Sequence, residues 1–179
     1  MSSDLHVLSP ATRARIEELM ARYPKPRSAI LPALHAIQEE LGWCPEEAQA
    51  EVAEMFGMPA AEVRSLVTFY YMYHRQPVGR HVIKICRSIS CWLRGAERLQ
   101  KQLEDELGIG LGETTPDGAF SLVGGECLAG CCGAPVLQIN DRFFENAEQD
   151  RVKELLKELR AGSDRYPKAP ESWSPKGDK

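Results

Sequence analysis

Four of the six cysteines in this 179-residue chain stand in two pairs, and this arrangement limits the possible folds more than any other feature. Cys86 and Cys91 are separated by four residues, and Cys127 and Cys131 by three. Clustered thiols in a chain without a secretory signal more often bind metal or carry out redox chemistry than form disulfides. The fold therefore has to bring two pairs that are distant in sequence to one place.

The segments around the two pairs predict how they meet. Residues 81–85 have the apolar character of a strand, residues 93–107 carry leucines at helical spacing, and residues 120–123 form a second strand. Two strands joined by a crossover helix run parallel, so their carboxyl ends emerge at the same edge of a sheet. Each cysteine pair follows one of these strands, and all four thiols are expected to converge there.

Such a site holds either an iron–sulfur cluster or a structural zinc ion, and the spacing favours the cluster. A zinc site with four cysteines also accepts ligands two to four residues apart, so spacing alone does not exclude zinc. A 2Fe–2S cluster contains two metal atoms and needs a wider clamp, and four cysteines are its usual ligands. Thiol catalysis is the least favoured alternative, because the chain contains no Cys-x-x-Cys motif.

The two remaining cysteines are interpreted as non-ligands. Cys132 follows Cys131 directly and is expected to be a bystander thiol, although a ligand swap between the two stays open. Cys44 is expected to be a small buried apolar residue. Donors and cations beside a cluster raise its reduction potential, and the groups expected to act in this way are the Ser88 and Ser90 hydroxyls, the side chains of Arg87 and Arg94, and backbone N–H groups at Gly130 and Gly133.

The chain is predicted to be of the α+β class with two domains and a tail. Residues 1–78 form helices that begin near Ser9-Pro10 and make a helical bundle. Residues 79–161 form a small α/β domain, which ends with a hairpin and a helix over about 149–160. The tail, residues 162–179, contains Trp173 and three prolines and is expected to be an extended segment that docks on a partner chain.

Composition argues against nucleic-acid and membrane functions. The net charge is −4, and residues 36–63 contain no Lys or Arg. That segment instead carries seven acids, which would repel the phosphates approached by a helix-turn-helix protein: Glu39, Glu40, Glu46, Glu47, Glu51, Glu54 and Glu62. No signal peptide and no run of roughly 18 apolar residues is present, so the protein is expected in the cytoplasm without direct membrane insertion.

The motifs around the cysteines resemble a known family. They are Cys86-Arg87-Ser88-Ile89-Ser90-Cys91 followed by Gly95, and Glu126-Cys127-Leu128 through Cys131 followed by Ala134-Pro135-Val136. Further matches are Ile30-Leu31-Pro32 to Gly42-Trp43, Thr68-Phe69-Tyr70 and Thr115-Pro116-Asp117-Gly118. Over roughly residues 10–160 the chain resembles the thioredoxin-like 2Fe–2S subunits of NADH–quinone oxidoreductase, respiratory complex I.

The resemblance implies a helical bundle before a thioredoxin-like domain that binds one 2Fe–2S cluster. Cys86 and Cys91 would bind one iron, and Cys127 and Cys131 the other. The implied partners are a flavin subunit that carries FMN and NADH beside this cluster, and a larger iron–sulfur subunit, on the peripheral side of a membrane-bound complex. Related subunits occur in NAD-linked hydrogenases and formate dehydrogenases, so the parent complex stays open.

Two features depart from the family pattern. Ala129 stands where the family usually has Gly, with Gly130 next, and Cys132 adds a thiol beside the ligands. The chain also lacks a Gly-x-Gly-x-x-Gly signature for nucleotide binding, so the isolated chain is not expected to oxidise NADH.

Overall fold

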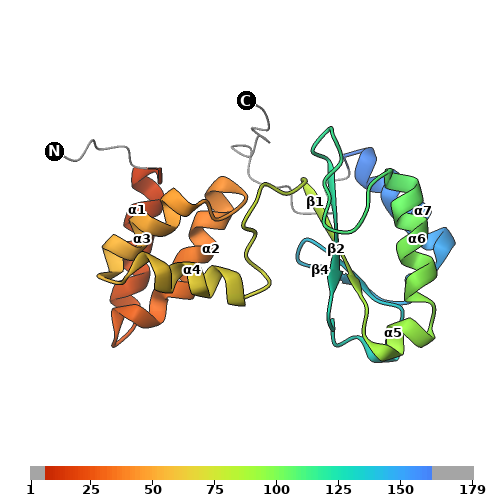
Figure 1. The fold of residues 1–179 in the computed structure, drawn as a ribbon, viewed down its shortest axis with the longest axis horizontal. Helices are drawn as coiled ribbons and strands as arrows, with labels where there is room; N and C mark the ends of the chain where they lie inside the picture. Colours follow the sequence, from red (N-terminus) through yellow and green to blue (C-terminus); the bar gives the residue numbers. More distant parts are fainter. Residues whose placement is uncertain (1–6, 163–179) are drawn as a thin grey trace. The chain divides into compact units, whose positions relative to one another are not determined.

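The computed structural model describes residues 7–162, which divide into two compact units between Pro77 and Val78 (Figure 1). The expected α+β class is confirmed, with a helical unit followed by an α/β unit. The helical unit contains α1 (Pro10–Arg22), a 3-10 turn (Pro26–Ala29), α2 (Ile30–Leu41), α3 (Glu46–Phe56) and α4 (Ala60–Phe69). The expected docking tail with Trp173 lies outside the described residues.

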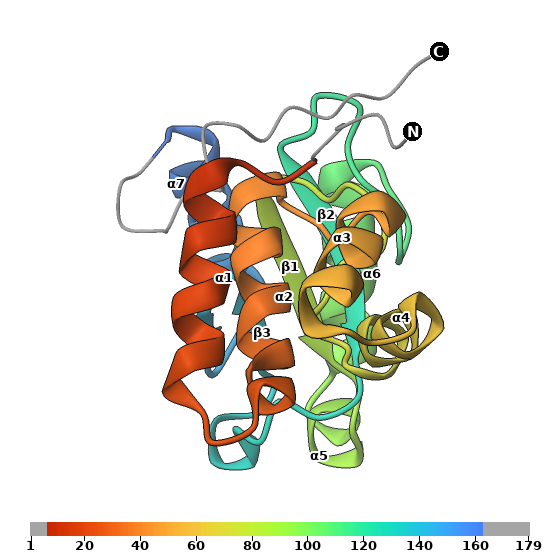
Figure 2. The ribbon, with the colours of Figure 1, turned by 90° about the vertical axis from the view of Figure 1, so that its left-hand side faces the viewer.

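The helical unit is held together by one apolar core. Helix α1 begins as predicted, because Pro10 is its first residue and the Ser9 Oγ accepts a hydrogen bond from the Thr12 N–H at 3.2 Å. Helices α1 and α2 lie side by side in Figure 2. The fully buried side chains of this core include Ile16, Leu34, Ile37, Val52 and Val63.

Arginines neutralise much of the acidic segment of this unit. Glu51 pairs with Arg13 at 2.6 Å and Glu46 with Arg64 at 2.8 Å. Two further ion pairs join Glu39 to Arg15 and Glu62 to Arg27. The surface around residues 36–63 is therefore less negative than that segment of the sequence indicated. The arginines that pair with its acids lie outside the segment, before residue 36 or after residue 63.

The α/β unit is a four-stranded sheet in the order β2-β1-β3-β4. Its strands are β1 (His81–Cys86), β2 (Phe120–Gly125), β3 (Leu137–Ile139) and β4 (Arg142–Phe144), and its helices are α5 (Ile89–Leu93), α6 (Ala96–Leu107) and α7 (Gln149–Arg160). Strand β1 pairs parallel with β2, as predicted, and antiparallel with β3. Helices α6 and α7 cover one face of the sheet, over a core that includes Ile83, Ile85 and Leu122 (Figure 1).

The helix expected over residues 93–107 is present as α6, but it begins at Ala96. A separate short helix, α5, precedes it, because Gly95 adopts a φ of 93° between the two. Cys91 consequently lies on a short helix of its own rather than in a loop. Among residues 7–162, no helix has both the length and the apolar character needed to cross a lipid bilayer.

Candidate metal centre

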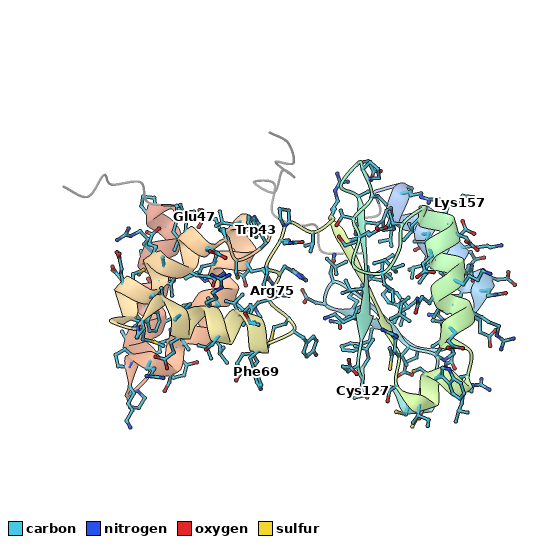
Figure 3. The ribbon with its side chains drawn as sticks, in the orientation of Figure 1. Trp43, Glu47, Phe69, Arg75, Cys127 and Lys157 are labelled. Atoms are coloured by element: carbon cyan, nitrogen blue, oxygen red, sulfur yellow. The ribbon has the colours of Figure 1, made fainter. Side chains whose placement is uncertain are left out.

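The parallel pairing of β1 and β2 brings the two cysteine pairs to one end of the sheet. Cys86 is the last residue of β1 and lies opposite Gly125, the last residue of β2. The Arg87 N–H donates to the Gly125 carbonyl at 2.9 Å, which fixes the two chain ends beside each other. Cys127 follows β2 directly, and Figure 3 places it at the end of the sheet where α5 lies.

The other two cysteines reach this end on short helical segments. Cys91 is carried by α5, whose first turn is closed by a hydrogen bond from the Trp92 N–H to the Ser88 carbonyl at 2.9 Å. Cys131 begins a 3-10 turn, Cys131–Gly133. The structure therefore gathers the four cysteines singled out in the sequence around one sheet end.

The four thiols are unequal in their exposure to solvent. Cys86 and Cys91 are 2% and 1% exposed and pack in a small apolar cluster with Ala96, Leu128, Ala134 and Val136. Cys127 and Cys131 are exposed. A group held by all four would be shielded on one side and open to solvent, or to a partner protein, on the other.

Backbone amides make the Cys86 sulfur a good site for negative charge. Burial is the largest single influence and disfavours the thiolate. Hydrogen bonds from the backbone N–H groups of Ser88 and Leu128, together with those from the thiols of Cys91 and Cys127, outweigh it, so the pKa of Cys86 lies below its usual value. A metal ligand must be a thiolate, and this environment favours one.

The second buried thiol shares this network. Burial, and secondarily the hydrogen bond with Cys86, raise the pKa of Cys91 to about 11, although the Val136 N–H acts in the opposite direction. At the exposed side, the Ala129 N–H donates to the Cys127 Sγ at 3.4 Å. Amide N–H groups therefore point at three of the four sulfurs, and such donors are the usual second layer around a thiolate-bound cluster.

The donors differ from those predicted. The Gly133 N–H does not face a sulfur, because it donates to the Gly130 carbonyl at 3.0 Å. The left-handed backbone conformation of this loop falls at Ala129, with φ of 57°, the residue that departs from the family pattern. Sequence reasoning missed the amides of Leu128 and Val136, and the available signals were that Leu128 follows Cys127 directly and that Val136 belongs to the motif after Cys131.

Of the two cysteines expected not to be ligands, the structure supports the interpretation of one, Cys44. Cys44 is fully buried in the helical unit, in agreement with its interpretation as a small core residue. Cys132 is exposed within the same 3-10 turn as Cys131. The structure does not decide between these two neighbours as ligands, so the role of Cys132 stays a prediction.

Four thiols with amide donors suit a thiolate-ligated cluster. Within the described range, no three His, Cys, Asp or Glu side chains are gathered closely enough to hold a single metal ion. The donor set is sulfur throughout, which is the chemistry of 2Fe–2S ligation. The residues present therefore fit the cluster that the cysteine pattern predicts.

The chain matches a family model and several known proteins. The model of the thioredoxin-like [2Fe-2S] ferredoxin family matches residues 16–160. A subunit of the NADH-quinone oxidoreductase of Pseudomonas aeruginosa is 41% identical over 156 residues, which cover 87% of this chain and 94% of that protein. A subunit of the same name from Rhizobium meliloti is 46% identical over 149 residues, covering 83% and 89% respectively.

A solved structure gives the same fold within a larger chain. A chain of an NAD+-reducing [NiFe]-hydrogenase in its air-oxidized state superposes with a TM-score of 0.66 at 26% identity. The match covers 77% of this chain but 24% of the hydrogenase chain, so this chain spans about a quarter of that protein's length.

Proposed function

Because the chain belongs to the thioredoxin-like [2Fe-2S] ferredoxin family, we propose that it is an electron-transfer subunit of an NADH-oxidising complex. Its single 2Fe–2S cluster is held by Cys86, Cys91, Cys127 and Cys131. The observation that carries the proposal is that Cys86, at the paired ends of β1 and β2, hydrogen-bonds with Cys91 and Cys127, and that Cys131 lies near enough to Cys91 to influence its pKa. The bound cluster supplies one-electron chemistry, and the chain holds it and sets its surroundings.

The two pairs divide between the two irons in this proposal. Cys86 and Cys91 bind the shielded iron, and Cys127 and Cys131 bind the iron nearer to solvent. The difference in exposure between the pairs supports this division, because each pair comes from one chain segment and has one environment. The amides of Ser88, Leu128 and Ala129 orient the thiolates and offset their charge.

The electron partner is a flavin subunit that binds FMN and NADH. NADH gives up two electrons as a hydride, and a flavin is the cofactor that accepts a hydride and passes electrons on singly. This chain has no nucleotide-binding signature, so hydride transfer belongs to the partner. A larger iron–sulfur subunit of the same complex completes the path, and the chain lies on the peripheral, cytoplasmic side of that complex.

The parent complex is NADH–quinone oxidoreductase in this proposal. The relatives of that name match at 41% and 46% identity and over nearly their whole length. The second candidate is the equivalent subunit of an NAD-linked hydrogenase, which the superposition on a hydrogenase chain at 26% identity favours less strongly.

Reduction of the cluster by NADH tests the function directly. The chain is prepared alone and together with its flavin-binding partner subunit, and the reduced-cluster EPR signal is recorded after addition of NADH or dithionite. Dithionite is expected to produce the signal in both preparations, and NADH only when the partner is present. A cluster that dithionite reduces but NADH leaves oxidised in the intact complex would contradict the proposal.

A further inference from the structure

The loop that carries Cys131 is contacted by two side chains of opposite charge. The Arg94 Nε donates to the Ala134 carbonyl at 3.4 Å. Glu145 lies against two glycines of the loop. A Cβ added at Gly133 would be 2.6 Å from the Glu145 Oε2, and one added at Gly130 would be 3.5 Å from its Oε1.

Backbone hydrogen bonds hold Arg94 and the segment that follows Glu145 in place. The Arg94 N–H donates to the Ser90 carbonyl at 3.2 Å, which fixes it at the end of the helix that carries Cys91. The segment after Glu145 is joined to the loop by hydrogen bonds from the Asn146 N–H to the Gly133 carbonyl, at 2.6 Å, and from the Ala147 N–H to the Pro135 carbonyl, at 2.9 Å.

The glycine at position 133 is explained by this contact. The Glu145 Cβ would lie 2.5 Å from a Cβ at Gly133, which is closer than two carbon atoms can approach. Only glycine lets the carboxylate-bearing residue lie on the loop. The close approach therefore places a negative charge beside the Cys131 turn, where a larger loop residue would push it away.

We propose that Arg94 and Glu145 are an opposed pair that sets the reduction potential of the cluster. Arg94 raises the potential and Glu145 lowers it, because both charges contact the loop that holds one ligand. This inference rests on the proposed function, since it requires a cluster bound by Cys131. Both residues act through the electrostatic potential at the cluster and neither is a ligand.

The physical reason is the charge that reduction adds. A cluster with four thiolate ligands is negative when oxidised, and reduction adds one further electron. A fixed cation close by stabilises the reduced state, and a fixed carboxylate destabilises it. Both side chains are exposed, so solvent and salt weaken the effect. Neutralising one of them is expected to change the ratio of reduced to oxidised cluster, at a fixed potential, by on the order of threefold.

Arg87 is placed differently from Arg94. Its side chain lies against Gly124 of β2, where an added Cβ would be 3.0 Å from its Cδ. From the sequence, Arg87 and Arg94 had the same expected role, and in the structure they contact different segments of the chain.

An EPR-monitored redox titration of the full-length chain with its cluster tests the pair. Glu145→Gln is expected to shift the midpoint potential upward and Arg94→Gln downward, each by the equivalent of about a threefold change, where a tenfold change equals about 59 mV. The double variant should return close to the wild-type midpoint. The conservative variants Glu145→Asp and Arg94→Lys should retain most of the wild-type value, and raising the salt concentration should shrink both shifts.

Controls of the same chemistry separate a local from a general effect of charge. Glu154→Gln and Arg151→Gln neutralise exposed residues of α7 and should leave the midpoint unchanged. If a Gln variant does not retain the cluster, Glu145→Ser and Arg94→Ser are titrated instead, with the same expected signs. A purely structural role would shift both variants in the same direction or neither.

The outcomes distinguish this inference from the proposed function. Midpoints that move in the same direction, or not at all, would overturn the opposed pair while the cluster and its function stand. A wild-type chain that carries no cluster would overturn both. Opposite shifts that the control variants do not reproduce would establish the pair.

Discussion

Each unit of the protein contains a fully buried cysteine, and the two thiols have opposite properties. In the helical unit, burial raises the pKa of Cys44 to about 12, and its Sγ lies 3.6 Å from the Leu34 carbonyl oxygen, which accepts from the thiol. In the α/β unit, Cys86 is also shielded from solvent, but hydrogen bonds from backbone N–H groups and neighbouring thiols lower its pKa. Burial alone therefore disfavours the thiolate at Cys44, and the hydrogen bonds around Cys86 favour it there, as a metal ligand would require.

Replacing Cys44 and Cys86, one at a time, should give the largest difference in cluster content. Cys86→Ser is expected to abolish or strongly deplete the cluster, because a hydroxyl is a poor substitute for a thiolate ligand. Cys44→Ser should leave the cluster spectrum intact and cost some stability, since a polar group enters an apolar core. Visible absorbance per chain and the reduced-state EPR signal measure both effects. Equal loss of cluster in the two variants would break the comparison.

The vicinal cysteines provide a second form of this test within the α/β unit. Cys131→Ser should deplete the cluster, and Cys132→Ser should leave its EPR signal nearly unchanged. Both residues are exposed in the same short turn, so any difference between them reflects ligation and not folding. The reverse pattern would identify Cys132 as the ligand.

Replacing one core residue in each unit should show whether the two units unfold separately. Ile37 and Ile85 are both fully buried, in separate apolar cores. Replacing either by Ala is expected to lower the unfolding free energy by about 2–5 kcal/mol. We propose that residues 1–78 and 79–161 are separate domains, and therefore Ile85→Ala should promote loss of cluster absorbance in denaturant, whereas Ile37→Ala should affect the helical far-UV CD transition. Identical shifts of both transitions in both variants would contradict that boundary.

A smaller effect is expected from filling the space that Glu145 occupies at the Cys131 loop. Gly133→Ala should destabilise the α/β unit by about 1–3 kcal/mol, because the loop or Glu145 must move. Gly110→Ala is the matched control, since the nearest atom to its added Cβ is the Glu113 Oε2 at an ordinary 3.5 Å. Its effect should stay within about 0.5 kcal/mol in the same denaturant titration. Equal effects would refute the close contact at Gly133.

The smallest expected effect is a dependence of the stability of the α/β unit on pH. Burial, and secondarily the Arg80 charge, lower the pKa of His81 below 6.5. The unfolded chain therefore binds a proton near pH 6.5 that the folded chain binds only at lower pH, and the unfolding free energy should fall as pH decreases below about 6.5. His81→Phe should flatten this dependence when denaturation midpoints are compared across pH 5–8. An unchanged slope in His81→Phe would assign the dependence to other groups.

The sequence was sufficient to predict the parts of the site that depend on periodicity and spacing. Strand positions and the crossover rule predicted that strands over residues 81–85 and 120–123 run parallel, and the structure confirms the pairing, with ends at Cys86 and Gly125. The N-cap at Ser9 followed from residue type alone. These features are local, or follow from a topological rule, so they need no knowledge of side-chain packing.

The remaining features depend on contacts between distant residues and were not predictable. The two-helix arrangement at Gly95 requires a left-handed backbone that a leucine pattern does not reveal. The arginines that neutralise the acidic segment, and Glu145 beside the Cys131 loop, are brought into place by tertiary packing. The amide donors at Leu128 and Val136 belong to the backbone, and their direction cannot be read from residue identity.

The most direct test of the central claim is the metal and sulfide content of the chain prepared without oxygen. Four converging thiols with amide donors predict about two irons and two acid-labile sulfides per chain, and little zinc. The same analysis of Cys44→Ser should give the same stoichiometry, and that of Cys86→Ser should give far less iron. One zinc ion per wild-type chain with no sulfide would contradict the account.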